Sequence, residues 1–386
     1  MNLKRYSKAM WGFGVVAAVG LASAIAAPSA IAAKYTVRYA MQQVPEDFVY
    51  RAKDWGAKYD LKVEETVSPS AVRSMEALLA GQADIVDSGS GPVLSAMSRA
   101  PDKLIIVAAT HSGGQRHELM VRPDAPYKSV ADLKGKRIAI AVGSGAYIIF
   151  EKYIAKQGWT NADFQVVNMK PGDMGSAIAS GQIDAALTWE PTPSILVTKG
   201  VVKEIQSFPE VSSDPALLVT TRDFAKAHPE ALARAIASMM DMYHLITSDP
   251  NAAGELAAKV EAGSGATVAP AAFARAFQHM TFDMRVTDES IAALRSVGEF
   301  MVKEHRIPSV PDFKTLVDMR YLEEAAKLTG TNLGPWAGAP PSGLPVELDL
   351  RRPGFFPVLG RVERLAGGRV ELLGYRICLR ARKPLY

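Results

Sequence analysis

Two stretches a hundred residues apart repeat one pattern: ALLAGQADIVDSG (77–89) and AIASGQIDAALTW (177–189). Each starts with apolar residues, reaches a Gly–Gln pair, and continues through an Asp into a second apolar run. A glycine at a helix end accepts the left-handed backbone that stops the helix, and the short apolar run after it suits a buried strand. The repeat therefore predicts one helix–stop–strand unit in each of two lobes. A length of 386 residues, more than one core usually serves, favours the same division.

The residues around each copy extend the alternation of strand and helix. In the first lobe, strands are expected in KYTVRYAMQQ, LKVEETV and ADIVDSG, with helices over 45–59 and 72–80. In the second lobe, strands are expected in KGKRIAIAVGSG, FQVVNMK and IDAALTW, with helices over 146–157 and 174–180. This order is typical of a mostly parallel sheet covered by helices. The fold class predicted is therefore α/β, with two lobes that each contain such a sheet.

A two-segment hinge is expected between the lobes. The segment HSGGQRHELMVRPD leads from the first lobe to the second, and the apolar strand PALLVT (215–220) returns the chain. The following residues have helical periodicity in five segments: 229–247, 252–260, 270–279, 290–304 and 316–328. We accordingly assign lobe 1 to residues 33–113 and 219–332, and lobe 2 to residues 114–218.

Both ends of the chain differ from the middle. Residues 1–32 have a positively charged start, an apolar run over 11–27 and a small-residue A-x-A site at 30–32, which is typical of a secretory signal peptide. The alternative is a membrane anchor. We expect a periplasmic protein whose mature chain has no transmembrane segment. Residues 333–386 are rich in Arg, Pro and Gly; they form either a basic, partly disordered extension or an out-of-frame translation, with a hairpin favoured in GRVELLGYRICL, and we assign them no function.

Charge and cysteine usage exclude several classes. The formal net charge of +4 includes +3 from residues 1–33 and +5 from residues 333–386, which leaves about −4 for the middle region. A negative core region is not expected to bind nucleic acid. The single cysteine, Cys378, cannot form an intrachain disulfide. We expect a monomer.

Two strand-to-helix turns are candidates for anion binding. The first copy of the repeat ends in DSGSGP, where Pro92 suits the first turn of a helix, and the second lobe has an equivalent turn in VGSGAY. Free backbone N–H groups and the positive end of a helix favour an anion, and ligands of open α/β sheets bind at such strand ends. One turn alone is explained as a simple connection, but the matching pair predicts an anion held between the lobes by Ser88, Gly89, Ser90, Gly143, Ser144 and Gly145.

The second copy ends differently, in TWEP. Trp189 offers a flat aromatic face for an alkyl chain or a cation, and Glu190 accepts hydrogen bonds from a ligand ammonium. The alternative is that Trp189 packs in the core and Glu190 is a helix-start charge. Thr110 and His111, just after the strand KLIIVAA, are further candidates from the hinge, although a lone histidine is more often structural.

Catalytic and metal signatures are missing from the sequence. The six histidines form no H-E-x-x-H motif, and there is no Walker A loop, no G-x-S-x-G and no G-x-G-x-x-G. No cysteine precedes Cys378. We therefore predict no catalytic residue, no metal site and no cofactor, and do not expect an enzyme.

These motifs resemble the substrate-binding proteins of ABC importers, in the nitrate/sulfonate/taurine-binding branch. The resemblance extends over about residues 35–328 and rests on ALLAGQADI with SGSGP, PYKSVADLKGKRIAIAVGSGAY and AIASGQIDAALTWEP. It implies a hinge that closes on the ligand, and docking to a membrane permease with its ATPase. Carried over by position, the ligand contacts it implies are Gln42, Ser88, Gly89, Ser90, Thr110, Gly143, Ser144, Trp189 and Glu190. The tail departs from the family, which normally ends near the last helix.

The functional prediction is a periplasmic solute-binding protein for a small organic anion. An alkyl or amino sulfonate such as taurine is the first choice, because Glu190 would pair with an amine opposite the anion. Nitrate, a carboxylate or a thiamine-precursor pyrimidine remain alternatives, as does a periplasmic sensor input. An enzyme of pyrimidine synthesis is a rival that the signal peptide and cysteine usage argue against, and a regulator's effector lobe would need an N-terminal helix-turn-helix.

Overall fold

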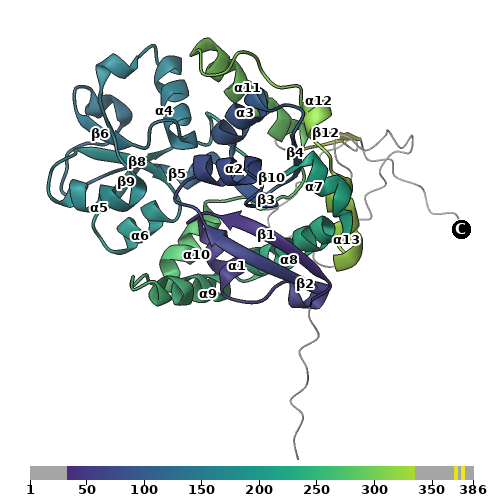
Figure 1. The fold of residues 1–386 in the computed structure, drawn as a ribbon. Helices are drawn as coiled ribbons and strands as arrows, with labels where there is room; N and C mark the ends of the chain where they lie inside the picture. Colours follow the sequence, from purple (N-terminus) through teal and green to yellow (C-terminus); the bar gives the residue numbers. More distant parts are fainter. Residues whose placement is uncertain (1–32, 335–368, 373–374, 379–386) are drawn as a thin grey trace, which may run out of the picture. The chain divides into compact units, whose positions relative to one another are not determined.

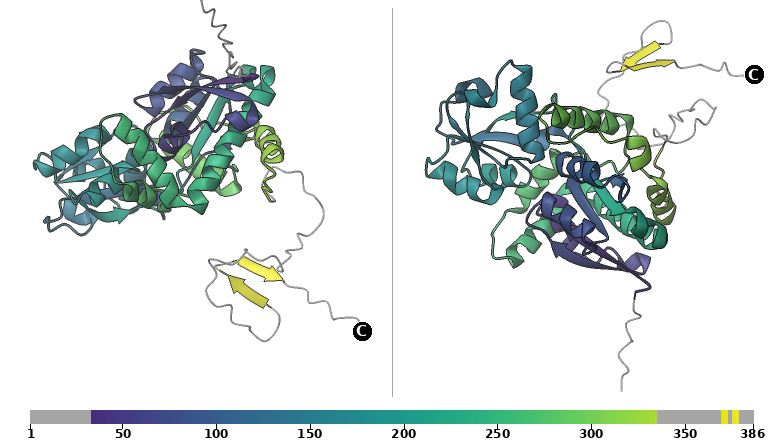
Figure 2. Two further views of the ribbon diagram at one scale, coloured as in Figure 1. Left: turned by 90° about the horizontal axis from the view of Figure 1, so that it is seen from below. Right: turned by 45° about the horizontal axis from the view of Figure 1, so that its top comes forward.

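The computed structural model describes residues 33–334, 369–372 and 375–378. The chain divides into two units, Met1–Ala337 and Gly338–Tyr386. The described part of the second unit is an antiparallel hairpin of β11 (Arg369–Leu372) and β12 (Tyr375–Cys378), drawn in yellow in Figure 2. This confirms the hairpin predicted in the tail. The predicted signal peptide lies outside the described residues.

The first unit contains two five-stranded sheets, each with helices around it (Figure 1). We call the elements around the first sheet lobe 1. Its sheet has the order β2-β1-β3-β10-β4, in which β10 is antiparallel to both neighbours and β1 is parallel to β2 and β3. The strands are β1 (Tyr35–Met41), β2 (Leu61–Val67), β3 (Ile85–Gly89), β4 (Leu104–Ala109) and β10 (Ala216–Thr221).

Lobe 2 surrounds the second sheet, which has the order β7-β6-β8-β5-β9. Here β5 is the antiparallel strand, between β8 and β9, while β6 is parallel to β7 and β8. The two sheets therefore follow the same plan, and in each the antiparallel strand comes directly after a hinge crossing. The strands are β5 (His117–Val121), β6 (Arg137–Ile140), β7 (Gln165–Asn168), β8 (Ala185–Trp189) and β9 (Lys203–Ser207).

Helices cover both sheets. Lobe 1 has α1 (Pro45–Arg51), α2 (Ala71–Leu79), α3 (Ser90–Arg99), α7 (Arg222–Ala227), α8 (Pro229–Ser248), α9 (Pro250–Gly263), α10 (Pro270–Gln278), α11 (Asp288–Lys303), α12 (Phe313–Leu316) and α13 (Arg320–Thr329). Lobe 2 has α4 (Gly145–Lys156), α5 (Pro171–Ala179) and α6 (Thr192–Thr198). Short 3₁₀ turns are η1 (Ala57–Tyr59), η2 (Gly114–Arg116), η3 (Val130–Leu133) and η4 (Asn161–Asp163). No helix of the described residues combines the length and apolar character that crossing a membrane requires.

Alternating strand residues build a core on each face of the second sheet. Leu119 and Val121 of β5 pack in one cluster with Phe150 of α4, whereas Met120 packs in another with Ile178 of α5. Strands buried on both faces form continuous apolar runs in the sequence, as in AALTW of β8, whereas β5 begins with the polar pair His117 and Glu118.

The repeated phrase is a structural device, as predicted. Gly81 and Gly181 both have positive φ, 71° and 73°, just after α2 and α5. In lobe 1, Arg38 donates to the Gly81 carbonyl (2.7 Å) and to Asp84 (3.1 Å from Nε). In lobe 2, Arg137 does the same for Gly181 (2.9 Å) and Asp184 (3.0 Å from Nε). The Asp of each GQxD phrase therefore fixes the helix stop to the neighbouring strand.

Two antiparallel segments connect the lobes. Gly113 N–H donates to the Ser213 carbonyl (2.6 Å), and Ala216 N–H donates to the His111 carbonyl (2.8 Å). Gly114 has no room for a side chain, since a Cβ there would lie 2.4 Å from the Phe208 carbonyl oxygen. The predicted two-segment hinge thus exists, although β10 begins at Ala216, two residues before the end of the range that we assigned to lobe 2.

Three details differ from the sequence predictions. The helix predicted over 45–59 ends at Arg51, and Trp55 packs beyond it through a hydrogen bond from Nε1 to the Val49 carbonyl (3.1 Å). The helix predicted over 316–328 is interrupted, because α12 ends at Leu316 and α13 starts at Arg320. Strands β5 and β9 were not predicted.

Candidate functional site

The carboxyl ends of the parallel strands lie where the two lobes meet. The first turn of α3 packs against α4 of lobe 2: a Cβ at Gly91 would lie 2.8 Å from Cδ1 of Ile148. Ile148 itself belongs to the hydrophobic core of lobe 1. The two strand-to-helix turns predicted from the sequence are therefore brought together.

A carboxylate of the protein, that of Asp214, lies between these two turns. Its Oδ1 accepts a hydrogen bond from Ser90 Oγ (2.5 Å), the first residue of α3. Its Oδ2 accepts from Arg116 Nη2 (2.7 Å), and a Cβ at Gly145, the first residue of α4, would lie 2.7 Å from the same oxygen. Asp214 lies within the second hinge segment, just before β10, and is 2% exposed. The junction of the two helix starts thus holds a carboxylate of the protein itself, whereas the sequence predicted a ligand anion between these turns.

Burial and the Arg116 charge determine the protonation states of Asp214 and His117. Burial acts to raise the pKa of Asp214, but the Arg116 guanidinium and the Ser90 hydroxyl outweigh it, so the pKa lies below its ordinary value. Burial and the Arg116 charge lower the pKa of His117 to about 3. His117 is therefore neutral at physiological pH, with Nε2 3.3 Å from Asp214 Oδ2.

Three buried carboxyl groups gather beside the end of β1; we call Glu46, Asp47 and Asp87 the acidic cluster. Asp47 accepts hydrogen bonds from the Gln42 N–H (2.6 Å) and the Tyr39 hydroxyl (3.3 Å). Burial, then the neighbouring carboxylates, raise the pKa of Asp47 well above its ordinary value and that of Asp87 to about 7. Glu46 Oε1 lies 2.5 Å from Nδ1 of His111.

A third network ties α10 of lobe 1 to lobe 2; we call it the α10 latch. Arg275 donates to both oxygens of Glu118 (3.0 and 2.9 Å) and to Glu204 (3.0 Å). His279 Nδ1 lies 2.7 Å from Glu118 and 3.1 Å from Glu190. Hydrogen bonds to these two carboxylates raise the pKa of His279 to about 9. The latch is therefore charged at neutral pH.

Glu190 is part of this latch. Its carboxylate accepts from Ser194 Oγ (2.7 Å) and Ser194 N–H (3.1 Å) and lies 3.4 Å from Arg275. Glu118, Glu190 and His279 have ligand atoms within 4.8 Å of one another, a spacing that a metal ion accepts. Arg275 already supplies the positive charge at this position, so we assign no metal to it.

The other sequence-predicted residues are distributed over both lobes. Gln42 Nε2 donates to the Asp87 carbonyl (2.9 Å), and Thr110 is fully buried. Ser144 is the N-cap of α4 and accepts from the Tyr147 N–H (3.3 Å), whereas Gly143 and Gly89 have open space around their Cβ positions. Trp189 packs at the margin of the lobe 2 core. The structure therefore groups Gln42, Ser88, Gly89, Ser90, Thr110 and His111 on lobe 1, and Gly143, Ser144, Gly145, Trp189 and Glu190 on lobe 2.

Of the titratable residues in these three networks, sequence reasoning proposed only Glu190 and His111 as ligand contacts. Asp214 precedes a proline, which is typical of a turn. Glu46 and Asp47 have the position of ordinary acidic residues in the first turn of a helix. Arg116 stands in a Gly-rich hinge segment. No pattern of spacing marks these positions, because the residues meet only through the hinge and the strand edges.

Buried polar atoms without a hydrogen-bond partner cluster near the carboxyl ends of the strands and the start of β5. Among the described residues, such atoms belong to Glu46 (both oxygens), Asp87, Ser88, Arg116 (Nε), His117 (Nδ1), Thr188 and Arg306. Asp87 and Ser88 stand at the end of β3 and Thr188 at the end of β8, Arg116 and His117 stand just before and at the start of β5, and Glu46 lies in the first turn of α1. Native proteins pair nearly all buried polar groups, so a concentration of unpaired ones marks a place that takes a polar partner.

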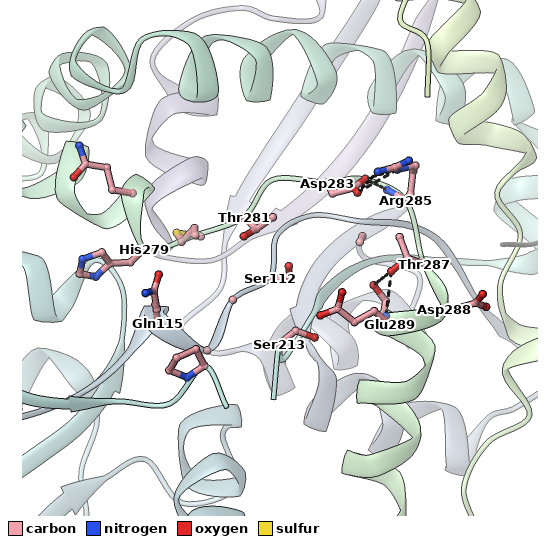
Figure 3. Close-up of a pocket in the computed structure, with 17 residues that line it drawn as sticks. Ser112, Gln115, Ser213, His279, Thr281, Asp283, Arg285, Thr287, Asp288 and Glu289 are labelled. Atoms are coloured by element: carbon pink, nitrogen blue, oxygen red, sulfur yellow. Dashed lines mark hydrogen bonds and ion pairs between the residues drawn. The ribbon is translucent and has the colours of Figure 1, made fainter. Parts of the chain in front are cut away.

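A cavity of about 670 Å³ lies elsewhere, beside the hinge (Figure 3). Both hinge segments and the connection between α10 and α11 line it, with side chains that include Ser112, Gln115, Ser213, His279, Asp283 and Arg285. None of the ligand contacts predicted from the sequence lines this cavity.

The two sheets, the hinge and the facing strand ends define a two-lobed protein of the periplasmic-binding type. The NMT1-like family matches residues 38–261, and the chain belongs to this family.

Two relatives carry names that refer to sulfonates or taurine. A protein of Escherichia coli strain K12 named for binding aliphatic sulfonates is 25% identical over 165 residues, 43% of this chain and 51% of the relative. The taurine-binding periplasmic protein of the same strain is 26% identical over 203 residues, 52% of this chain and 61% of the relative. The chain thus spans between half and two-thirds of the length of these relatives.

Solved structures share the fold. The alkanesulfonate-binding protein SsuA from Xanthomonas axonopodis pv. citri, bound to MOPS, superposes with a TM-score of 0.65 at 22% identity, covering 73% of this chain and 98% of that one. The desulfurization enzyme DszB superposes with a TM-score of 0.59 at 15% identity, covering 76% and 99%. At these identities the likeness shows the fold alone, since one fold serves binding proteins and enzymes.

Proposed function

We propose that this protein is the periplasmic solute-binding protein of an ABC importer and holds a small organic anion between its lobes. The observation that carries the proposal is the concentration of unpaired buried polar atoms at the facing strand ends. They come from both lobes, so a ligand that pairs with them bridges the lobes. Bridging contacts stabilise the closed arrangement, which is the signal that such a protein gives to a transporter.

The arrangement around Asp214 supports an anionic ligand. Two helix starts, the Ser90 hydroxyl and the Arg116 guanidinium already stabilise one carboxylate there. A sulfonate carries the same single charge on three oxygens and accepts hydrogen bonds from the same donors. The names of the relatives, which refer to aliphatic sulfonates and taurine, support a sulfonate over nitrate or a carboxylate.

We propose Ser88, Ser90, Arg116 and His117 as ligand contacts beside Asp214. Ser88 is fully buried with an unpaired hydroxyl, and the unpaired Nδ1 of His117 and Nε of Arg116 belong to the opposite lobe. Gly89 and Gly143 leave open space where a ligand approaches the backbone. Trp189, at the margin of the lobe 2 core, is proposed as the apolar wall.

Export and docking follow from the same proposal. The N-terminal 32 residues would direct secretion, and the loaded protein would dock to a permease with its ATPase. N-terminal sequencing of the protein from a periplasmic extract tests the first point, with Ala33 expected as the first residue. An intact N-terminus in the membrane fraction would contradict it.

Thermal denaturation with a panel of anions tests the ligand class. The protein is unfolded and refolded first to remove copurified ligand, and then scanned with propane-1-sulfonate, taurine, nitrate and acetate. A ligand at about 100 times its Kd stabilises the folded state by about 2.7 kcal/mol, which raises the Tm measurably. We expect sulfonates to raise the Tm more than acetate or nitrate. If no anion of the panel raises the Tm, the proposed function is wrong.

A further inference from the structure

The carboxylate of Glu46 is buried without adequate partners. Glu46 lies in the first turn of α1 and is 1% exposed. Neither of its oxygens receives a hydrogen bond, although Oε1 lies 2.5 Å from Nδ1 of His111. A buried carboxylate with so little compensation is costly, so its environment calls for a donor or a cation.

The neighbours of Glu46 increase this demand. Its charge raises the pKa of both Asp47 and Asp87, so the three carboxyl groups lie close together. Asp87 also has an unpaired oxygen, Oδ1, and is 1% exposed. Among the described residues, His111 is the single basic side chain within ion-pair distance of the acidic cluster. The cluster therefore has more acid than its own protein neutralises, and its complement is positive.

The acidic cluster stands beside the proposed anion site. Gln42 directly follows β1 and its side chain donates to the Asp87 carbonyl, and Asp87 is the chain neighbour of Ser88 in the proposed anion site. His111 belongs to the hinge segment, its Nδ1 lies 2.5 Å from Glu46 Oε1, and it is among the groups that lower the pKa of Asp214. One imidazole thus connects the acidic cluster to the carboxylate between the helix starts.

The sequence pointed to Glu190 as the partner of a ligand amine. In the structure, Ser194, Arg275 and His279 surround the Glu190 carboxylate, which has no unpaired buried oxygen. A ligand ammonium would have to break the α10 latch to reach it. Glu46 and Asp87 present unpaired oxygens instead.

We propose that Glu46 and Asp87 bind the ammonium group of a zwitterionic ligand, a small amino sulfonate whose sulfonate binds at the helix starts. This inference rests on the proposed function, because the sulfonate end uses the anion site. Glu46 Oε2 and Asp87 Oδ1, which have neither a hydrogen bond nor an ion pair, would accept from the N–H donors of the ammonium. The ligand would then carry the positive charge that the cluster lacks.

Proton release is a signature of this mode. Because the pKa of Asp87 is raised to about 7, the free cluster is partly protonated at neutral pH. Binding an ammonium favours the ionised carboxylates and releases that proton. Other titratable groups around the cluster are Tyr39, Tyr243 and His111; burial raises the pKa of both tyrosines well above the ordinary value, so they stay neutral. Affinity for an ammonium ligand should therefore rise with pH.

Taurine and propane-1-sulfonate test the inference as a matched pair, since a methyl group replaces the ammonium. Calorimetric titration of the mature protein should give a Kd for taurine that is at least about tenfold lower than the Kd for propane-1-sulfonate. Raising the pH from about 6 to about 8 should lower only the taurine Kd, because the aliphatic ammonium of taurine stays protonated over this range. The E46Q variant should bind the two ligands within about twofold of each other. Glu76→Gln, at an exposed position on α2, is the control and should keep the preference.

The outcomes separate the two proposals. Equal affinities of the wild type for both sulfonates, or tighter binding of propane-1-sulfonate, overturn the ammonium site and leave the proposed function standing. Binding of neither sulfonate overturns both. If E46Q does not fold, the wild-type pH profile decides: a taurine affinity that does not rise with pH contradicts the inference.

Discussion

Asp214 is the residue on which the anion site depends, because it places a negative charge where a ligand anion would bind. It reaches this position from a hinge residue with φ of 39°, in the left-handed region that Asp tolerates better than most residues. Arg116 and Ser90 hold its carboxylate. A ligand anion therefore competes with Asp214 or has to be accommodated beside it.

Replacing Asp214 with Asn is expected to tighten sulfonate binding about tenfold, since the amide keeps the shape but removes the competing charge. The amide also keeps a hydrogen-bond acceptor for Arg116, which limits the cost of an unpaired buried guanidinium. Calorimetric titration with propane-1-sulfonate measures the effect. Asp173→Asn, in an exposed pair with Lys170, serves as the control and should change nothing. Weaker binding by D214N would mean that Asp214 supports the ligand.

Asp87 makes stability depend on pH. Its pKa rises from about 4 when unfolded to about 7 when folded, so the folded state binds more protons within this window. Stability should therefore fall as pH rises from about 4 to about 7. Urea denaturation at several pH values should show a smaller fall for Asp87→Asn than for the wild type. Asp102→Asn, at an exposed position, is the control, and a D87N slope equal to the wild-type slope would contradict the assignment.

The residues of this site that follow strand ends could be predicted from the sequence, but most of its charged residues could not. Ser88, Ser90 and Gly145 could be predicted because Gly-Ser turns after apolar strands have a local signature. Asp214, Arg116 and Glu46 have none, since what matters is their burial next to residues far along the chain. The position of Glu190 at a strand end could be predicted, but its partners could not. Arg275 and His279 belong to α10 and its C-cap, more than eighty residues later in the chain.

At the scale of elements, α10 connects the lobes through charged side chains. Arg275 and His279 reach Glu118 on β5, and His279 also reaches Glu190 at the end of β8. Glu118 is fully buried, so its pairing matters far more than that of an exposed carboxylate. The latch therefore favours contact between the lobes as long as His279 is charged.

The latch predicts a pH effect on lobe closure. Since its pKa is raised to about 9, His279 contributes fully below about pH 6.5, and this contribution is lost as pH rises through about 9. Distances between spin labels on the two lobes should lengthen or broaden over this range in the wild type. His279→Gln should remove the pH dependence, while the exposed His244→Gln should retain it. Unchanged distances across the range would contradict the latch.

Most elements could be predicted because buried parallel strands and amphipathic helices have strong periodicity. Strand β9 was missed since KEIQS is short and half-exposed. Strand β5 was missed because HELMV begins with a polar pair that is buried by tertiary contacts, His117 beside Asp214 and Glu118 in the latch. The helix ending at Arg51 shows that Gly56 and the packing of Trp55 outweigh the apolar spacing of the later residues.

At the scale of the molecule, several contacts of different chemistry join the lobes. Besides the latch and the Asp214 junction, Arg306 pairs with Glu151 of α4 (2.8 Å) and Lys152 donates to Ser296 of α11 (2.8 Å). Figure 2 shows the two lobes from two further sides. Closure is therefore supported at both sides of the hinge, and the tight packing of the helix starts lies between them.

That packing gives the last prediction. Gly145→Val should open the lobes, because even a Cβ there would lie 2.7 Å from Asp214 Oδ2 and would push aside the hinge carboxylate that joins Ser90 of lobe 1 to Arg116 of lobe 2. Opening the lobes separates the Ser90 donor from the donors of lobe 2, so sulfonate affinity should fall at least about tenfold. Each lobe keeps its own core, so the Tm of the free protein should change little. Small-angle scattering should give a larger radius of gyration. Gly172→Val on α5, where a Cβ meets nothing within 4 Å, is the matched control. A G145V protein that binds sulfonate like the wild type would show that ligand binding does not need the two helix starts in contact.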